Sequence, residues 1–244
     1  MKTFKLDLHI HSCLSPCADL EMSPMSIVEK SLAKGLDGIA VCDHNSAENA
    51  AAVFRAGVQR SLHVLPGMEI NSVEEVHTLA IFDTEEQALS MQDIVYQHLS
   101  GSNRPDVFGD QIVVNEFDEV AHFNDKLLIG ATQLKLHEVV DQVHRLGGLS
   151  IASHVDRPSY SILSQLGFIP PDLELDALEV SYRSSPESFM GCVPGGERLS
   201  LITSSDAHFN SDIGKVYTSF LIEIPSVEEI RMAFRGQSGR RVIC

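Results

Sequence analysis

The chain has 244 residues, of which 34 are acidic and 18 are lysine or arginine, so its formal net charge at pH 7 is −16. A surface this acidic repels polyanions, and we expect neither a membrane nor long duplex nucleic acid as a partner. The chain shows no signal-peptide pattern and no apolar run of membrane-spanning length, which predicts a cytoplasmic location. The five cysteines are odd in number and scattered, which argues against a disulfide framework.

Apolar residues alternate between strand-like and helix-like spacing along the chain. The spacing predicts strands at 4–10, 37–43, 65–70, 76–82, 149–154, 176–182, 200–208, 216–224 and 240–244. It predicts helices at 23–35, 46–57, 84–100, 135–148 and 226–236, the second of them closed by Gly57. Residues 101–133 break the alternation, and we predict an insertion there.

Strands that alternate with helices are typical of parallel sheets built from βαβ units. About seven such units, with no glycine-rich dinucleotide fingerprint, favour a β/α barrel over an open sheet. The length fits a single catalytic domain over residues 1–244.

Histidines and carboxylates gather at the predicted strands, mostly at their carboxyl ends. Because these ends open on one face of a barrel, the side chains should converge on one mouth. Buried imidazoles and carboxylates must be paired or bound to metal, and this mixture suits Zn, Mn or Fe. Residues i and i+2 of a strand share a face, so His9 and His11 can hold one ion together. The full set is His9, His11, Asp43, His44, Glu69, His77, His154, Asp206 and His208.

Six short motifs carry a family resemblance. They are HIH (9–11), CDH (42–44), GMEI (67–70), VHTLAIF (76–82), ASH (152–154) and SSDAH (204–208). In this order they resemble the polymerase and histidinol phosphatase superfamily, the PHP domain, over residues 4 to about 210. The resemblance implies a distorted (β/α)7 barrel that holds two or three divalent metal ions and acts on phosphoric esters.

The resemblance also implies how the ligands are shared among the ions. The first ion would take His9, His11, Glu69 and Asp206, and Glu69 would bridge to a second ion held by His77 and His154. A third ion would take His44, His208 and one residue of the loop that follows HIH.

That loop, SCLSPCADLEMSP, is two or three residues longer than the common family pattern. Alignment of MSP (22–24) with the usual LSP selects Asp19 as the third ligand, whereas counting from His11 selects Cys17. We prefer Asp19, because a carboxylate suits a hard, hydrolytic metal cluster better than a thiolate does.

The expected activity is hydrolysis of a small phosphomonoester, a nucleotide or a short oligonucleotide end by a metal-activated hydroxide. Asp206 or a metal-bound imidazole would accept a proton, His208 would protonate the leaving oxygen if the third ion is absent, and Asp43 would orient His44. Arg157 and Arg183 follow strands and are predicted to bind phosphate.

Two alternative functions stay open. One is a metal-dependent amidohydrolase or deaminase, although Glu69 stands where such enzymes usually place a lysine. The other is a non-catalytic, metal-binding PHP module.

Overall fold

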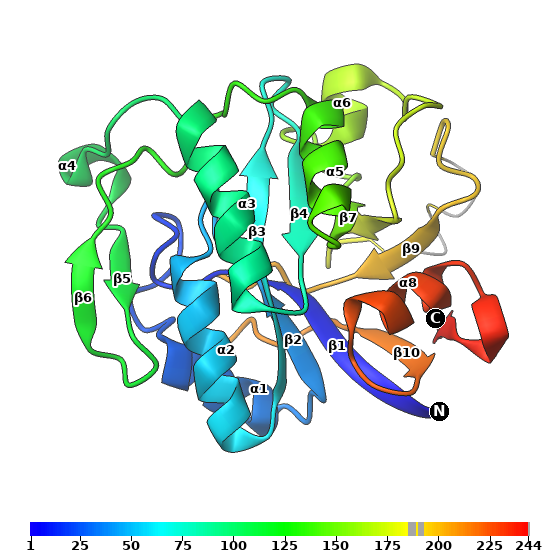
Figure 1. Ribbon diagram of the computed structural model, residues 1–244, viewed down its shortest axis with the longest axis horizontal. Coiled ribbons are helices and arrows are strands. Elements are labelled where there is room, and N and C mark those ends of the chain that lie inside the picture. Colours follow the sequence, from blue (N-terminus) through cyan, green and yellow to red (C-terminus); the bar gives the residue numbers. More distant parts are fainter. Residues whose placement is uncertain (185–188, 190–192, 244) are drawn as a thin grey trace.

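The computed structural model describes residues 1–184, 189 and 193–243 (Figure 1). Its strands are β1 Lys2–Ile10, β2 Gly38–Val41, β3 His63–Asn71, β4 His77–Ile81, β5 Ile112–Val114, β6 Val120–Phe123, β7 Leu149–Ala152, β8 Ala177–Val180, β9 Ser200–Thr203, β10 Thr218–Ile222 and β11 Arg241–Ile243. Its helices are α1 Pro24–Ala33, α2 Glu48–Arg60, α3 Glu85–His98, α4 Pro105–Phe108, α5 Leu136–Arg145, α6 Ile162–Leu166 and α8 Val227–Phe234. Cys13, Cys17 and Cys42 are free thiols, and Cys192 and Cys244 lie outside the described residues.

The main sheet curves into a barrel. Its strand order is β11-β10-β1-β2-β3-β4-β7-β8-β9, with β1, β2 and β3 parallel to one another and β7, β8 and β9 likewise. The two ends meet beyond β9, where Ile10 bridges Ala207 in parallel and the His11 N–H donates to the Ala207 carbonyl oxygen at 2.9 Å. The predicted distorted (β/α)7 barrel is therefore confirmed, with β10 and β11 added outside β1.

One strand runs the opposite way, so the expectation of a wholly parallel barrel is wrong at β4. This strand is antiparallel to both β3 and β7. The cause is the short connection: Asn71 ends β3, His77 begins β4, and the two residues pair directly. A return to a parallel strand needs a crossover of a dozen residues or more, whereas a turn this short can only form a hairpin.

Helices cover the barrel from outside, and α1, α2 and α3 lie over β2 and β3 in Figure 1. A buried cluster that includes Ile39, Val53, Met68 and Met91 joins these helices to the strands. A second cluster joins β1, β4 and β7 to α8 through residues such as Leu8, Leu79, Ile151, Phe220 and Phe234.

Helix α2 is longer than predicted. Gly57 does not end it; the helix continues to Arg60, and Ser61 closes it with a left-handed φ of 59°. Gly57 is buried inside the helix, where an added Cβ would lie 2.4 Å from Val64 Cγ2 of β3. Glycine therefore allows α2 to approach the sheet closely and does not act as a stop signal here.

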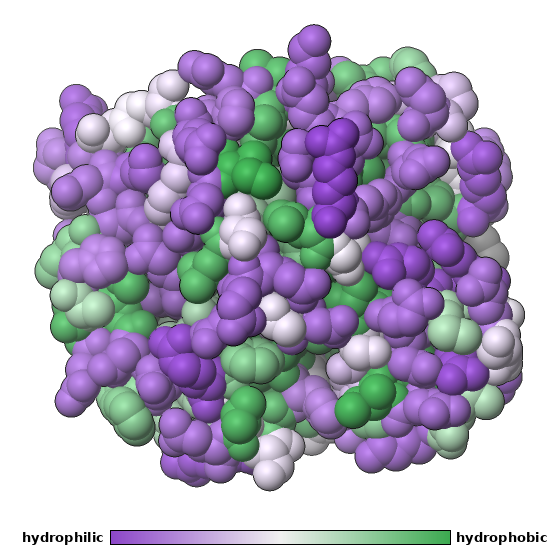
Figure 2. All heavy atoms as spheres, viewed as in Figure 1, coloured by the Kyte–Doolittle hydropathy of each residue, from purple (hydrophilic) through white to green (hydrophobic). Residues whose placement is uncertain are grey.

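Residues 101–133 form α4 and the β5–β6 hairpin, which lie beside α2 at the edge of the molecule (Figure 1). The Asn49 side chain of α2 anchors the hairpin by donating to the Ile112 carbonyl oxygen and accepting from the Val114 N–H, each at 3.0 Å. The face in Figure 2 is mostly hydrophilic, with scattered apolar side chains. Among the described helices, none has the length and apolar character needed to cross a membrane.

The close pairing of β3 and β4 yields a stability prediction. A Cβ at Gly67 would lie 2.6 Å from the Ala80 carbonyl oxygen and 3.1 Å from Cys42 Sγ, and backbone cannot move aside cheaply. We expect Gly67→Ala to lower the free energy of unfolding by about 1–3 kcal/mol, measured by urea denaturation. The control is Val58→Ala at a 67% exposed position of α2, which should change stability by no more than about 0.5 kcal/mol. Equal stability of the two variants would contradict the prediction.

Candidate metal centre

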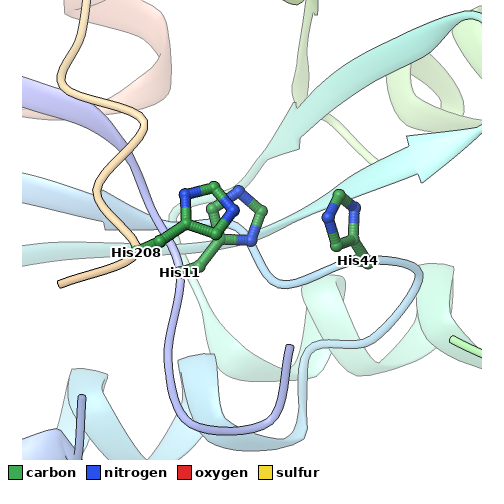
Figure 3. Close-up of side chains that lie close together, drawn as sticks. All are labelled: His11, His44 and His208. Atoms are coloured by element: carbon green, nitrogen blue, oxygen red, sulfur yellow. The ribbon is translucent and has the colours of Figure 1, made fainter. Parts of the chain in front are cut away.

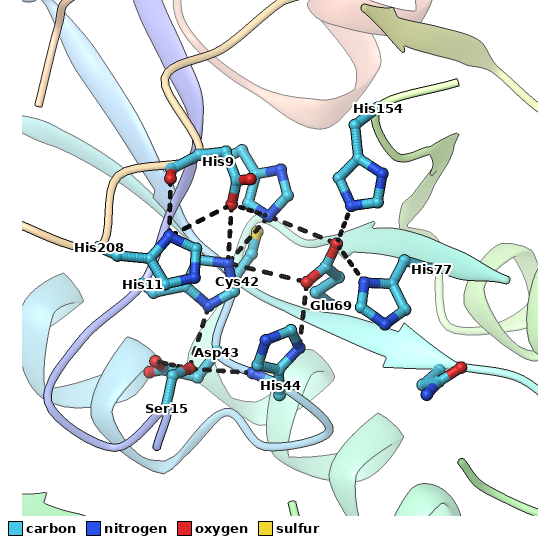
Figure 4. A network of polar contacts seen from close by, with 12 residues as sticks. His9, His11, Ser15, Cys42, Asp43, His44, Glu69, His77, His154 and His208 are labelled. Carbon is cyan, nitrogen blue, oxygen red and sulfur yellow. Dashed lines mark hydrogen bonds and ion pairs between the residues drawn. The ribbon is translucent and has the colours of Figure 1, made fainter. Parts of the chain in front are cut away.

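The chemistry-bearing side chains converge at one end of the barrel (Figure 4). His9 and His11 come from the end of β1, His44 follows β2, and Glu69 lies near the end of β3. Because β4 is reversed, its first residue, His77, reaches the same end. The last members are His154 after β7 and Asp206 and His208 after β9.

The Glu69 carboxylate lies at the middle of this group. Oε1 lies 3.0 Å from His77 Nδ1 and 3.2 Å from His154 Nε2. Oε2 lies 3.1 Å from His44 Nδ1. Although burial would raise the pKa of Glu69, the surrounding histidines lower it well below its usual value, so Glu69 is ionised. An ionised carboxylate with two shared oxygens is suited to bridge two cations.

His9, His11 and Asp206 form a tighter group beside it. His9 Nε2 and His11 Nε2 are 3.1 Å apart, and Asp206 Oδ1 lies 3.4 Å from the first and 3.1 Å from the second. His9 Nδ1 contacts the Glu179 carboxylate at 3.0 Å, so the proton of neutral His9 is assigned to Nδ1. His11 Nδ1 likewise carries a proton, because it contacts Ser15 Oγ, whose own hydroxyl donates to Asp43. Both Nε2 atoms therefore present lone pairs to the same point as a carboxylate oxygen.

Such a convergence of lone pairs fits a cation. Although burial opposes a charge on His9, Glu179, Asp206 and Glu69 raise its pKa well above the usual value, so the group favours positive charge there. His77 Nδ1 is buried without a hydrogen-bond partner among the described residues, although it lies 3.0 Å from Glu69 Oε1. Neutral imidazoles and carboxylates at this spacing are the ligands that Zn, Mn and Fe accept. The residues present thus fit divalent ions.

A third group lies toward the outside. The ligand atoms of His11, His44 and His208 all lie within 4.8 Å of one another. His11 and His208 stack with ring centroids 4.3 Å apart, and His44 faces them (Figure 3). His208 Nδ1 donates to the Asp206 carbonyl oxygen at 2.8 Å, which leaves Nε2 free.

The two loop residues that the sequence left in competition, Asp19 and Cys17, have different surroundings. Asp19 lies outside the three ligand groups found among the described residues, and its Oδ1 accepts the Glu21 N–H at 2.8 Å. Cys17 lies outside these groups as well. Burial would raise the pKa of the Cys17 thiol, but His44 and His208 lower it to about 6.

Asp43 does not face the ligand atoms; it contacts Ser12 and Ser15 beside them. Its carboxylate accepts from the Ser12 N–H, from Ser12 Oγ and from Ser15 Oγ at 2.6–2.7 Å. Through Ser15 it fixes the ring of His11 and the backbone N–H of His44. Asp43 is thus linked through Ser15 to both His11 and His44, and its role in orienting His44 stays a prediction.

Sequence reasoning missed Glu179. This buried residue of β8 holds His9 Nδ1 and accepts the backbone N–H of His154 at 3.1 Å. A signal was present in the sequence, because Glu179 interrupts the apolar run of the strand DALEVSY. An acid inside a buried strand needs a partner, and here the partner is a histidine of the centre.

The backbone is strained at the same place. His154 and Asp206 adopt positive φ values of 29° and 49°, which non-glycine residues rarely take. Each such conformation costs about 1–3 kcal/mol and persists where the surroundings enforce it. Here the bond from the His154 N–H to Glu179 helps to do so.

The two arginines have different surroundings. Arg157 forms an ion pair with Asp206 Oδ2 while its side chain stays 32% exposed, so it lies at the rim of the centre. Arg183 lies on an exposed turn, where its guanidinium contacts the Tyr182 ring and hydroxyl. Among the described contacts, Arg183 is not brought to the histidine cluster.

Comparisons with solved structures identify the architecture. Endonuclease Q from Pyrococcus furiosus, a lesion-specific endonuclease, superposes with a TM-score of 0.70 at 18% identity, covering 99% of this chain and 58% of that one. Endonuclease Q in complex with a 27-mer duplex that carries an abasic lesion at the active site gives 0.68 at 20% identity, covering 98% and 58%. A protein assigned as a metal-dependent phosphoesterase from Bifidobacterium adolescentis gives 0.59 at 20% identity, covering 87% and 91%. This chain therefore spans somewhat over half the length of the endonuclease chains.

One expectation from composition is overturned by these structures. The exclusion of long duplex nucleic acid is wrong as an inference from net charge, because Endonuclease Q, a protein of the same fold, is seen with a 27-mer duplex. Net charge sums over the whole surface, whereas a ligand meets the local field of the site.

Sequence comparison gives the family. The comparison with curated proteins finds no match. The sequence profile of the PHP domain, however, matches residues 7–169, and that of the PHP-associated segment matches residues 198–238. Since the first match alone covers more than half of a chain whose histidines and carboxylates converge at one barrel mouth, the protein belongs to the PHP domain family.

Proposed function

We propose that this protein is a metal-dependent phosphoesterase that hydrolyses a small phosphomonoester, a nucleotide or the end of an oligonucleotide. The observation that carries the proposal is the meeting of His9 Nε2, His11 Nε2 and Asp206 Oδ1 at one point, with Arg157 beside them. This arrangement offers ligands for a cation and a guanidinium for a phosphate in the same place.

The proposed metal ligands are the histidines and carboxylates that converge at the barrel mouth. Divalent ions held there would lower the pKa of bound water and stabilise the negative charge that develops on phosphoryl oxygens. Glu69, ionised and shared among the surrounding histidines, would hold two ions in fixed relation.

Asp206 would hold the ion, and Arg157 would hold the phosphate of the substrate. Burial would raise the pKa of Asp206, but the neighbouring His9 and His11 lower it, so Asp206 stays an anion. Its pairing orients Arg157, whose partly exposed guanidinium can grip phosphate from the solvent side.

An aromatic ring at the mouth supports a nucleotide substrate. Tyr160 stacks on His77 with ring centroids 4.8 Å apart, and it remains 44% exposed. An exposed ring beside the metal ligands suits the stacking of a nucleobase next to the scissile phosphate. Two of the structural neighbours described above, an endonuclease and a protein assigned as a phosphoesterase, agree with a phosphoric ester as the bond attacked.

Removal of a central carboxylate should abolish the activity. We expect Glu69→Gln and Asp206→Asn, which keep side-chain shape but lose charge, each to lower kcat/KM by at least about 100-fold. The substrates are p-nitrophenyl phosphate, a nucleoside 3′,5′-bisphosphate, a short single strand and a duplex with an abasic site, in the presence of Mn, Zn or Fe(II).

The matched control is Glu174→Gln, an exposed carboxylate on the segment before β8, which should keep full activity. A wild-type protein that hydrolyses none of these esters with any of the metals, but hydrolyses an amide substrate, would refute the proposal and support an amidohydrolase.

Loss of the carboxylate behind His9 should weaken metal binding without removing a ligand. In Glu179→Gln the amide would place an NH2 group against one of two N–H donors, His9 Nδ1 or the His154 backbone. We expect metal affinity to fall about 10–100-fold, measured by competition with a chromophoric chelator. Glu174→Gln is again the control, and an unchanged affinity in Glu179→Gln would show that His9 needs no such support.

A further inference from the structure

A cavity of about 630 Å³ opens at the end of the barrel opposite the metal centre. Its lining comes from the segments that precede β7, β8 and β9 and from α8, whereas His154 and Asp206 of the metal centre follow β7 and β9. None of the described residues that we assign to the metal centre or to the substrate lines it. Its volume lies in the range of about 300–1,000 Å³ that is typical of small-molecule sites.

Three arginines line this cavity. Arg198 precedes β9, Arg231 lies in α8 and Arg235 follows directly after α8. All three belong to residues 198–238, the segment matched by the PHP-associated profile. The whole chain has 34 acidic residues against 18 lysines and arginines, so the cavity differs in charge from the average surface. The local field at a site decides which ligand it attracts, and here that field is set by guanidinium groups.

Arg231 is fixed by its neighbours. Its Nε donates to Asp176 Oδ1 at 3.3 Å, its Nη1 to Glu228 Oε2 at 3.2 Å, and its Nη2 to the Gly148 carbonyl oxygen at 2.7 Å. The Asp176 carboxylate is buried and also contacts His144 Nε2 at 2.9 Å. Two carboxylates thus balance the charge of Arg231, and this side chain forms a rigid wall of the cavity.

Arg198 and Arg235 have charges that are not balanced in this way. Arg198 donates to the Pro171 carbonyl oxygen at 3.1 Å, which is a neutral acceptor. In the part of the chain that the structure describes, neither arginine forms an ion pair, and both side chains are exposed. Besides Asp176, only Glu174 among the lining residues carries a carboxylate. Two guanidinium groups facing one exposed carboxylate leave positive charge that an anion can neutralise.

The rest of the lining is largely apolar. Ile169, Leu173 and Leu175 line the cavity from the segment before β8, and Phe234 lines it from α8. These side chains are buried in the protein. Apolar walls with a few placed charged groups are typical of sites for organic molecules. The cavity therefore suits a ligand with an anionic group and an apolar body better than a free inorganic ion.

We propose that this cavity binds a small organic phosphate of the size of a nucleoside monophosphate. Arg198 and Arg235 would hold the phosphate, and the apolar wall would contact the organic part. Arginine is suited to this role because one guanidinium can donate two parallel hydrogen bonds to phosphate oxygens. The site needs no metal ion, so the inference goes beyond the proposed hydrolysis and does not depend on it.

Calorimetry on metal-free protein tests the site. Full-length protein is treated with a chelator and titrated with adenosine 5′-monophosphate, with adenosine and with inorganic phosphate. We expect the monophosphate to bind at one site per chain, at least about 10-fold more tightly than adenosine, which lacks the anion, or inorganic phosphate, which lacks the apolar body. A monophosphate that does not bind, or binds no more tightly than adenosine, would overturn the proposal.

Substitutions on both sides of the charge balance locate the ligand. Arg198→Gln and Arg235→Gln should each weaken binding of the monophosphate at least about 10-fold. Glu174→Gln should tighten it about 2- to 5-fold, because it removes the facing negative charge. The controls are Arg157→Gln at the metal centre and Arg241→Gln at an exposed position of β11, which should not change the affinity. Loss of binding in Arg157→Gln would place the phosphate at the barrel mouth and refute the assignment.

The two arginine variants are independent of each other. Arg235 is exposed and has no described hydrogen bond to lose, so Arg235→Gln should fold even if loss of the bond to Pro171 unfolds Arg198→Gln. Circular dichroism checks the fold of each. Wild-type affinity in folded Arg235→Gln would overturn the role of this arginine and, with it, the proposed site.

Discussion

The centre depends on one buried charge, the Glu69 carboxylate. Five histidine nitrogens, from His9, His11, His44, His77 and His154, lie within 3.7 Å of its two oxygens. These histidines come from β1, β4 and the segments after β2 and β7, so the carboxylate links most of the barrel mouth electrostatically. A buried carboxylate needs such polar partners to offset the loss of water around it. The histidines can reach Glu69 only because the strand ends that carry them meet at the same mouth of the barrel.

The reversed strand β4 is part of that solution. A parallel strand would present its carboxyl end at the mouth, whereas β4 presents its first residue, His77, next to Asn71 of β3. The hairpin brings Glu69 and His77 together across a short turn, with little loop to order. The same hairpin of β3 and β4 therefore distorts the barrel and brings His77 into the centre.

The support around the ligands is as specific as the ligands. Glu179 and Ser15 decide which nitrogen of His9 and His11 carries the proton, and hence which atom is free to bind. Ser15 Oγ also accepts the backbone N–H of His44 at 3.2 Å. A single hydroxyl, oriented by Asp43, thereby connects the inner and outer parts of the centre.

The sequence by itself determined the barrel class, the order of the strands and the histidines and carboxylates at their ends, because local periodicity and motif spacing are properties of short segments. It did not reveal the direction of β4, the continuation of α2 past Gly57, or the role of Glu179, because each depends on a neighbour distant in the chain. The choice between Asp19 and Cys17 shows the same limit. Residue type favoured the carboxylate; Asp19 accepts the Glu21 N–H, neither residue lies in the ligand groups found among the described residues, and the preference for Asp19 stays a prediction. Only the tertiary structure decides which atoms are left free, since that depends on every other bond made around them.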